Sequence, residues 1–196
     1  MVNGKVRVGI LISGRGSNMA ALIEASRAEN YPAEIALVVS NKADAAGLER
    51  ARAAGVEAIA LSVKAFAGRD AFEAAIDAEL RKRGVKIVCL AGYLRILGRA
   101  FVERWRGRMI NINPSLLPAY KGLHTHERAL ADGVTEHGCT VHLVTPELDD
   151  GEILAQARVP VLPGDDAETL GERVLAEEHR IFPQALAKLA RSLAAK

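Results

Sequence analysis

This sequence of 196 residues has few cysteines, few aromatic residues and little excess of charge of either sign. The two cysteines, Cys89 and Cys139, stand in separate apolar runs without CxxC spacing, so we expect both to be small buried hydrophobes. The formal net charge is only +2, and the densest basic stretch, residues 104–109, holds a single aromatic residue. Because so weak a field gives no basis for nucleic-acid binding, we expect no nucleic-acid partner.

Long hydrophobic runs are missing as well. No stretch approaches the roughly 18 apolar residues of a membrane span, and the first residues, MVNGKVRVGILIS, lack the cleavage pattern of a signal peptide. We therefore expect a cytoplasmic protein with no membrane partner. Hydrophobic residues make up 49% and charged residues 26% of the chain, as is usual for globular proteins. Because no repeat or Pro/Gly-rich linker divides the sequence, we expect one domain over residues 1–196.

Short β-branched runs alternate with helical segments along most of the chain. The runs are at residues 6–13, 35–40, 57–61, 86–92, 109–112 and 139–145, and the helical segments are at 17–28, 45–55, 69–84, 97–105 and 126–133. This alternation predicts a doubly wound α/β fold, with a mostly parallel sheet and helices on both faces. Such sheets bind their ligands at the carboxyl ends of the strands.

The last part of the chain departs from this alternation. The runs at residues 139–145 and 153–161 are joined by PELDDGE, which is too short for a crossover helix, so we expect an antiparallel pair. A long helix is expected from about Ala167, with Asp165 and Asp166 as candidate caps.

SGRGSNM, residues 13–19, lies between the first expected strand and the first expected helix. Its glycines allow a tight turn, and the free N–H groups at a helix start attract anions. The motif is not the dinucleotide fingerprint, because Met19 stands where GxGxxG needs a small residue. A phosphate site and an ordinary turn with Ser17 as N-cap are therefore equal alternatives for this motif taken alone.

NINP, residues 111–114, places two amides at the end of the fifth expected strand. Asn111 and Asn113 are two positions apart and share a face on a strand, and Pro114 keeps Asn113 out of the helical region. Two carboxamides on one face offer N–H donors to an oxyanion or a planar polar ligand. The plainer alternative is that both satisfy loop backbone.

The histidines give weaker signals. His124 and His126 form an HxH motif without a third ligand at a recognisable spacing, so we expect a loop-ordering role and no metal. His142 alternates with Val141 and Leu143, and a lone strand histidine is more often a core group than a catalyst.

Two carboxylates have both a structural and a functional interpretation. LDDG, residues 148–151, is typical of a turn, but its Asp149 follows a strand that should end on the same sheet edge as Asn111. Glu178 falls at helical spacing from Val174 and Phe182, so its carboxylate points along an apolar helix face. A buried carboxylate must be paired, so Glu178 either closes an ion pair or meets a polar ligand.

Five segments together resemble the glycinamide ribonucleotide formyltransferases of purine synthesis. They are SGRGSNM, LAGYLRIL, NINPSLLPAYKGLHTHERAL, GCTVHLVTPELDDG and EEHRIFP, and their order and spacing agree with that family. The resemblance implies transfer of a formyl group from 10-formyltetrahydrofolate to the amine of glycinamide ribonucleotide. We accordingly expect these two small molecules as partners, no metal, and a monomer or weak homodimer.

The resemblance also implies three groups of site residues. Those expected to bind the nucleotide substrate are Gly16, Ser17, Asn18 and Glu178, with Glu178 on the ribose. Those expected to bind folate are Arg95, Leu97 and the stretch from Val144 to Asp149. Two of the three expected catalytic positions are occupied by Asn111 and Asp149.

The third catalytic position departs from the family, whose motif N-I-H-P-S-L-L-P has a histidine where this chain has Asn113. A histidine held cationic by an aspartate stabilises an oxyanion and moves a proton, whereas an asparagine only donates a neutral hydrogen bond. We therefore expect impaired transfer with better preserved binding. LDDGE, in place of the usual LDGG, adds Asp150 beside Asp149 and leaves the choice of the acting aspartate open.

Two other functions stay open on these residues. One is a catalytically silent protein that still binds folate or a ribonucleotide. The other is a formyltetrahydrofolate deformylase, although that hydrolase usually has an extra domain before the catalytic one and lacks a GSN loop. A methionyl-tRNA formyltransferase would need a further C-terminal domain and a basic surface, neither of which the sequence offers.

Overall fold

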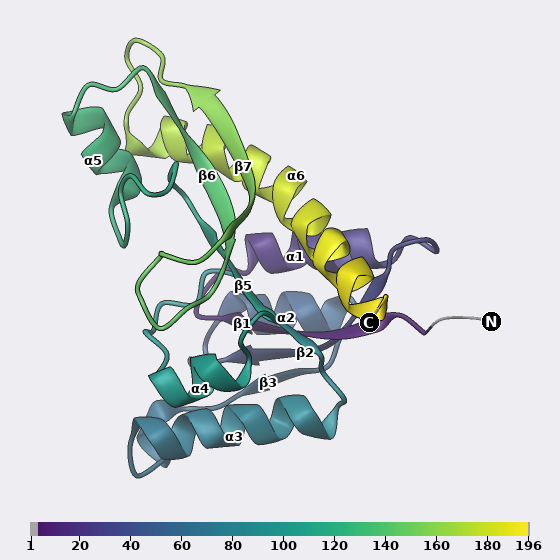
Figure 1. Cartoon of the computed structure of the whole chain (residues 1–196). Coiled ribbons are helices and arrows are strands. Elements are labelled where there is room, and N and C mark those ends of the chain that lie inside the picture. The colour runs from purple at the N-terminus through teal and green to yellow at the C-terminus, as the bar shows by residue number, and fades with distance from the viewer. Residues whose placement is uncertain (1–3, 196) are drawn as a thin grey trace.

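The computed structural model describes residues 4–195, and its centre is a seven-stranded sheet (Figure 1). The strands lie in the order β3-β2-β1-β4-β5-β6-β7. They are β1 (Val6–Ile12), β2 (Ala33–Ser40), β3 (Ala58–Ala60), β4 (Ile87–Leu90), β5 (Met109–Asn113), β6 (Glu136–Leu143) and β7 (Ile153–Pro160). Neighbours from β3 to β5 are parallel, whereas β6 is antiparallel to β5 and to β7. The predicted mostly parallel sheet with an antiparallel pair near its end is confirmed.

The chain changes its direction of travel across the sheet between β1 and β4. From β1 it moves outward to β2 and β3, and it then returns to β4 on the other side of β1. Loops that leave two neighbouring strands in opposite directions open a crevice at their carboxyl ends, where open α/β sheets bind ligands. The motif SGRGSNM follows β1 and the motif LAGYLRIL spans the end of β4, so both meet at this crevice.

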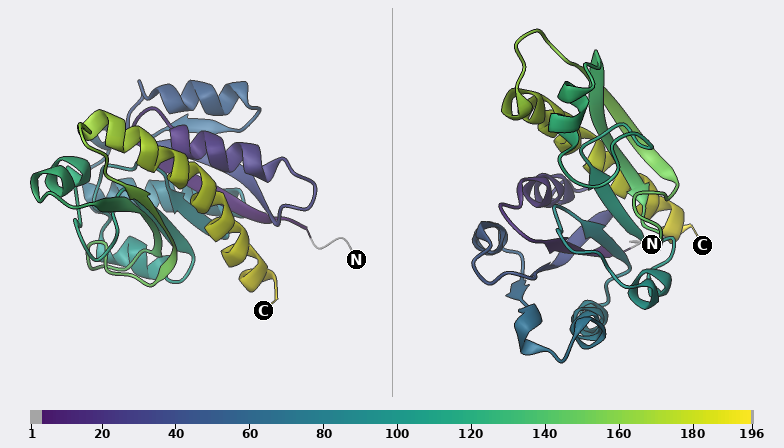
Figure 2. Two further views of the ribbon diagram at one scale, coloured as in Figure 1. Left: turned by 90° about the horizontal axis from the view of Figure 1, so that it is seen from above. Right: turned by 90° about the vertical axis from the view of Figure 1, so that its left-hand side faces the viewer.

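Helices cover both faces of the sheet, as predicted. They are α1 (Ser17–Ser26), α2 (Ala46–Ala53), α3 (Arg69–Lys82), α4 (Arg99–Arg104), α5 (Thr125–Ala131) and α6 (Ala167–Ala194), with a 3-10 turn at Val63–Ala65. Buried residues of α1, α2 and α6 pack on one face, and those of α3 and α4 pack on the other. Figure 2 shows α6 lying beside α1 on one face of the sheet, while α3 lies on the opposite face.

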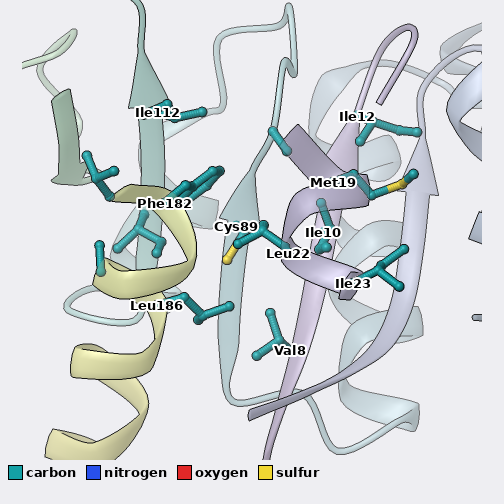
Figure 3. Packing of buried hydrophobic residues seen from close by; sticks show 14 of the residues in the cluster. Val8, Ile10, Ile12, Met19, Leu22, Ile23, Cys89, Ile112, Phe182 and Leu186 are labelled. Atoms are coloured by element: carbon teal, nitrogen blue, oxygen red, sulfur yellow. The ribbon is translucent and has the colours of Figure 1, made fainter. Parts of the chain in front are cut away.

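Alternation along the strands divides the buried side chains into two cores. In β1, Ile10 and Ile12 face the core beneath α1 and α6, whereas Leu11 faces the core beneath α3. Figure 3 shows the first core, to which Met19 of α1 and Phe182 of α6 both contribute fully buried side chains. Full burial of a side chain of this size stabilises a fold by about 1.5–3 kcal/mol. Helix α6 is thereby packed against helix α1.

The same alternation turns polar side chains of β5 and β6 away from the first core. Ile112 of β5 and Val141 of β6 lie in that core, together with Cys89 and Cys139, so the prediction of two buried cysteines is confirmed. The intervening positions, which face the other side of the sheet, hold Asn111, Asn113, Thr140 and His142. The two amides of NINP therefore share a face, as predicted.

One sequence expectation about β6 is wrong. The run at residues 139–145 was expected to end at the same sheet edge as Asn111, but β6 is antiparallel to β5 and places Leu143 beside Ile110. Val144 then donates its N–H to the carbonyl of Met109 at 2.9 Å, at the start of β5. The segment between β5 and β6 carries the seven-residue helix α5 and stays at the carboxyl end of β5, so that β6 runs back along β5 from that end. Asp149 comes near β5 because the loop after β6 folds back.

The start of α6 matches the expected capping. Asp166 is the N-cap; its carboxylate accepts from the Thr169 N–H at 2.8 Å, and the Thr169 hydroxyl accepts from the Asp166 N–H at 3.0 Å. This reciprocal pair satisfies two donors that a helix start otherwise leaves free. Within residues 4–195, no helix combines the length and the apolar character needed to cross a membrane.

Candidate active site

A cavity of about 680 Å³ is lined by the segments that follow β1 and β4, by β5, and by the loop after β6. Of the residues predicted to form the site, it is lined by Asn18, Arg95, Leu97, Asn111, Asn113, Val144, Asp149 and Glu178. Gly16 and Ser17 do not line it and lie immediately before Asn18, at the start of α1. The cavity therefore brings together side chains from the first strand connection, the central strands and the last helix.

The start of α1 is shaped by glycine and not by a side-chain cap. Gly16 is the N-cap, in the left-handed conformation with φ of 71°, and no side chain caps the helix there. A Cβ at this position would lie 3.0 Å from the Cα of Gly47, so two backbones approach closely here. The alternative with Ser17 as N-cap is wrong, because Ser17 is already helical. The first turn thus presents N–H groups without helical acceptors, as an anion site requires.

Asn18 and Glu178 join the first and last helices inside the cavity. The Asn18 amide donates from Nδ2 to Oε2 of Glu178 at 2.7 Å, and both side chains are buried. The Asn18 Oδ1 atom is buried and finds no partner within residues 4–195. Burial raises the pKa of Glu178 to about 7, against the opposing effect of the Asn18 hydrogen bond. The Asn18 amide oxygen, and the Glu178 carboxylate in its ionised form, can accept hydroxyl or amine hydrogens from a ligand.

Asn111, His142 and Asp149 form a second polar group in the cavity. Asn111 and His142 are directly paired across β5 and β6, and the Asn111 Nδ2 atom lies 3.2 Å from the His142 Nε2 atom. One carboxylate oxygen of Asp149 lies 3.7 Å from the same Nε2 atom. Sequence reasoning set His142 aside because a lone strand histidine is more often a core group, and 31 positions separate it from Asn111 in the chain. Only the pairing register of β5 with β6 brings the two together.

The His142 ring is held in one orientation by its other nitrogen. Its Nδ1 atom lies 2.9 Å from the carbonyl oxygen of Leu143, and this geometry assigns the Nδ1 hydrogen to that carbonyl. Burial lowers the pKa of His142, and the carboxylate of Asp149 opposes that effect. The neutral ring therefore keeps an acceptor at Nε2, which faces Asn111 and Asp149.

Asn113 lines the cavity, but one of its N–H groups is already engaged. The Asn113 Nδ2 atom donates to the Ser115 hydroxyl at 2.7 Å, and that hydroxyl donates to the carbonyl of Ala119 at 2.8 Å. The chain of bonds orders the turn after Pro114. The second N–H of the amide remains a possible donor, but it carries no positive charge toward a developing anion.

The two aspartates of LDDG have different surroundings. Asp149 lines the cavity, and its carboxylate accepts from the Gly122 N–H at 2.8 Å. Asp150 is exposed, does not line the cavity and forms an ion pair with Lys121. The next residue must be glycine, because a Cβ on Gly151 would stand 1.7 Å from the carbonyl oxygen of Leu143. The turn therefore tolerates a second carboxylate at position 150 without bringing it into the cavity.

An apolar rim borders the part of the cavity that lies over α4. Leu97 is buried beneath it, while Leu94 and Ile96 expose 66% and 75% of their surface. Sequence reasoning did not single out these two residues, although LAGYLRIL contains both. Large exposed apolar side chains grouped at a cavity mouth are typical of a ligand-binding or interaction site.

The predicted loop-ordering histidines have different partners. His124 is exposed and lies 3.6 Å from a carboxylate oxygen of Glu127. His126 places its Nδ1 atom 3.1 Å from the Nε2 atom of the buried His137, and its ring packs against Gly171 of α6. Within residues 4–195, no group of three or more His, Cys, Asp or Glu side chains is arranged to hold a metal ion.

Comparison with known proteins gives one consistent result. A family model described as formyl transferase matches residues 6–186. A phosphoribosylglycinamide formyltransferase of Escherichia coli is 48% identical over 174 residues, which cover 89% of this chain and 82% of that protein. The crystal structure of a phosphoribosylglycinamide formyltransferase from Brucella melitensis superposes with a TM-score of 0.92 at 55% identity, covering 95% of this chain and 96% of the other.

Longer relatives contain a similar segment as one part. The trifunctional purine biosynthetic protein adenosine-3 of Homo sapiens is 50% identical over 182 residues, 93% of this chain. This chain spans only 18% of that protein's length and 14% of the corresponding protein of Drosophila pseudoobscura pseudoobscura.

We predict that the His126 and His137 pair makes the fold acid-sensitive. Burial lowers the pKa of both, that of His137 to about 4, so the unfolded chain binds protons that the folded chain does not. The stabilisation is complete above pH 6.5 and declines as the pH falls toward 4, by about 1–3 kcal/mol. Urea unfolding at several pH values should show a shallower decline for His137→Gln than for the parent. The exposed His124→Gln serves as control, and identical slopes for parent and His137→Gln would contradict the prediction.

Proposed function

The chain belongs to the formyl transferase family, and on that premise we propose that it transfers the formyl group of 10-formyltetrahydrofolate to the amine of glycinamide ribonucleotide in purine synthesis. The observation that carries the proposal is a single cavity with a helix start and a buried carboxylate at one end and Asn111 with Asp149 further along. The folate is the co-substrate, and the reaction uses no metal.

The nucleotide is proposed to bind where α1 and α6 meet. Backbone N–H groups beginning at Gly16 and Ser17, with Asn18 beside them, suit a phosphate, because a helix start attracts negative charge. Glu178, held by Asn18 at 2.7 Å, suits the ribose hydroxyls, because an ionised carboxylate accepts two hydrogen bonds. This arrangement would aim the substrate amine toward β5.

The folate is proposed to bind over α4 and the loop after β6. Arg95, Leu97 and Val144 line that part of the cavity, and Asp149 lies where it meets β5. The exposed apolar rim at Leu94 adds surface for a flat ring system. Formyl carbon and substrate amine would then meet beside Asn111 and Asp149.

The proposed chemistry is acyl transfer through a tetrahedral state. The amine lone pair attacks the formyl carbon, a C–N bond forms, and the carbonyl electron pair moves to oxygen. When that pair returns, the bond from the formyl carbon to the folate nitrogen breaks and the nitrogen keeps the electrons. One proton passes overall from the amine to the folate nitrogen. In this scheme Asn111 donates a hydrogen bond to the oxyanion. The Asp149 carboxylate stabilises the positive charge of the group that carries the proton.

We propose that formyl transfer by this chain is slow because Asn113 stands where the family has a histidine. An amide neither titrates nor carries positive charge, and one N–H of Asn113 is bonded to Ser115. Binding is proposed to survive, because the nucleotide and folate contacts lie elsewhere. The same substitution favours a second candidate function, a silent protein that binds folate or the ribonucleotide without transferring the formyl group.

The nucleotide half of the proposal is tested by Glu178→Gln. Loss of a buried charged acceptor should weaken glycinamide ribonucleotide about 10- to 100-fold while leaving a folate analogue nearly unchanged, because the carboxylate lies at the α1 end of the cavity. Titration calorimetry with each ligand measures both affinities. The control is Glu177→Gln, since Glu177 pairs with Arg180 and does not line the cavity. Equal losses of affinity for both ligands, or no loss for either, would contradict the assignment of Glu178 to the nucleotide site.

The two aspartates can be separated by substitution. Asp149→Asn should lower formyl transfer by about 10²-fold or more, because it removes the carboxylate that faces His142. Asp150→Gly should change the rate by less than about threefold, since it removes only a partly exposed ion pair with Lys121. Steady-state rates of both variants give the ranking, and the reverse order would move the role to Asp150.

Restoring a histidine tests both the activity and its impairment. Asn113→His should raise kcat by about two orders of magnitude or more, with comparatively small changes in KM, because it returns a group that carries charge and moves protons. The silent-protein alternative predicts that the parent binds both substrates and transfers nothing. An unchanged kcat in a parent that already turns over at an ordinary enzymatic rate would show that Asn113 marks no impairment.

A further inference from the structure

We propose that His142, through its Nε2 atom, carries the proton in the formyl transfer that this chain performs, and so partly replaces the histidine that position 113 lacks. The inference rests on the proposed function. It assigns the role to a side chain on β6, the antiparallel neighbour of β5, two residue pairs along the ladder from Asn113.

The position of His142 fits this role. Its Nε2 atom lines the same cavity as Asn111 and Asp149, 3.2 Å from the amide nitrogen of one and 3.7 Å from a carboxylate oxygen of the other. The register pairs Asn111 with His142 and Asn113 with Thr140, so an imidazole at 142 stands on the same sheet face as a side chain at 113. A proton carrier at either position reaches the same part of the cavity.

The surroundings of the ring provide a partner for each protonation state. In the neutral ring, Nδ1 keeps its hydrogen on the Leu143 carbonyl and Nε2 accepts from the Asn111 amide. In the cationic ring, Nε2 carries a hydrogen and turns from acceptor to donor, and Asp149 is the anion that receives it. The Asn111 N–H is released by this change. It then becomes available to the oxyanion at the step where the oxyanion exists.

The proton that His142 takes up during the proposed reaction is the one that it later gives back. Nε2 takes the proton that the substrate amine loses as its C–N bond to the formyl carbon forms. The same proton passes to the folate nitrogen as the bond from that nitrogen to the formyl carbon breaks. His142 is unchanged after one turnover, and no further reactant is required.

Two charged groups act on the ring. Asp149 raises the pKa of His142 and Lys121 lowers it, while burial of the ring lowers it most. Lys121 is itself paired with Asp150, which moderates its effect. The neutral ring therefore predominates at pH 7, and a base in that form is ready to accept the amine proton.

The other histidines near the cavity lack this combination. His124 is exposed at the cavity mouth and faces Glu127, and His126 is turned toward His137. Of the described residues that line the cavity, His142 is the histidine with both an amide donor and a carboxylate at one ring nitrogen.

A double-mutant cycle tests the inference. Formyl transfer would be measured for the parent, His142→Gln, Asn113→His and the variant with both substitutions, each across pH 5 to 9. Calorimetry with glycinamide ribonucleotide and a folate analogue checks that every variant still binds. The control is His179→Gln, which replaces a half-buried histidine outside the cavity.

We expect His142→Gln to lower the parent kcat about 10²-fold or more and to lower kcat of Asn113→His less than about tenfold. The parent rate should fall on acidification through an inflection below pH 6.5, and His142→Gln should lack that inflection. Activity of the double variant also shows that His142→Gln folds.

Equal losses in both backgrounds, or an unaffected parent, would overturn the inference while leaving the proposed function intact. So would a parent without transfer beside an active Asn113→His variant. Transfer by neither protein, with both substrates bound, would overturn the proposed function and this inference together.

Discussion

The register of β5 against β6 is the constraint on which the rest of the site depends. It pairs Asn111 with His142 and keeps both on the face away from the first core. A slip of one residue on either strand would turn its polar side chains into that core, where Ile110 and Val141 now lie. Buried amide and imidazole groups without partners are strongly unfavourable, so the apolar alternation that fixes the fold also fixes the polar group.

Helix α6 supports both ends of the cavity. Its apolar face packs on β6 and β7 through Leu170 and Val174, and further along through Phe182 on the rest of the first core. Its only deeply buried carboxylate among the described residues, Glu178, is held by Asn18 at the start of α1. The helix that packs on the antiparallel strands therefore also supplies a buried carboxyl group to the α1 end of the cavity.

The sequence determines the fold more completely than it determines the site. Runs with a period of two or 3.6 predict the strands, the helices, the buried cysteines and the Asp166 cap, because local patterns encode them. The direction of β6 and the place of His142 depend on pairing between distant segments, which no local pattern encodes. Whether Asp149 or Asp150 faces inward depends on one turn, in which Asp149 has a left-handed φ of 47° and Gly151 has no room for a Cβ.

The hydrogen bond from Asn18 to Glu178 spans 160 positions of the chain. Closing a loop of that length is entropically unfavourable. We therefore expect this hydrogen bond to form later in folding than local contacts do. During synthesis, residues 87–149 emerge well before Glu178, so the strands and loops around Asn111 can assemble first. The pocket at the start of α1 gains its carboxylate only after the final helix has docked. A chain made only as far as residue 149 therefore holds Asn111, His142 and Asp149, but it lacks the carboxylate that lines the α1 end of the cavity.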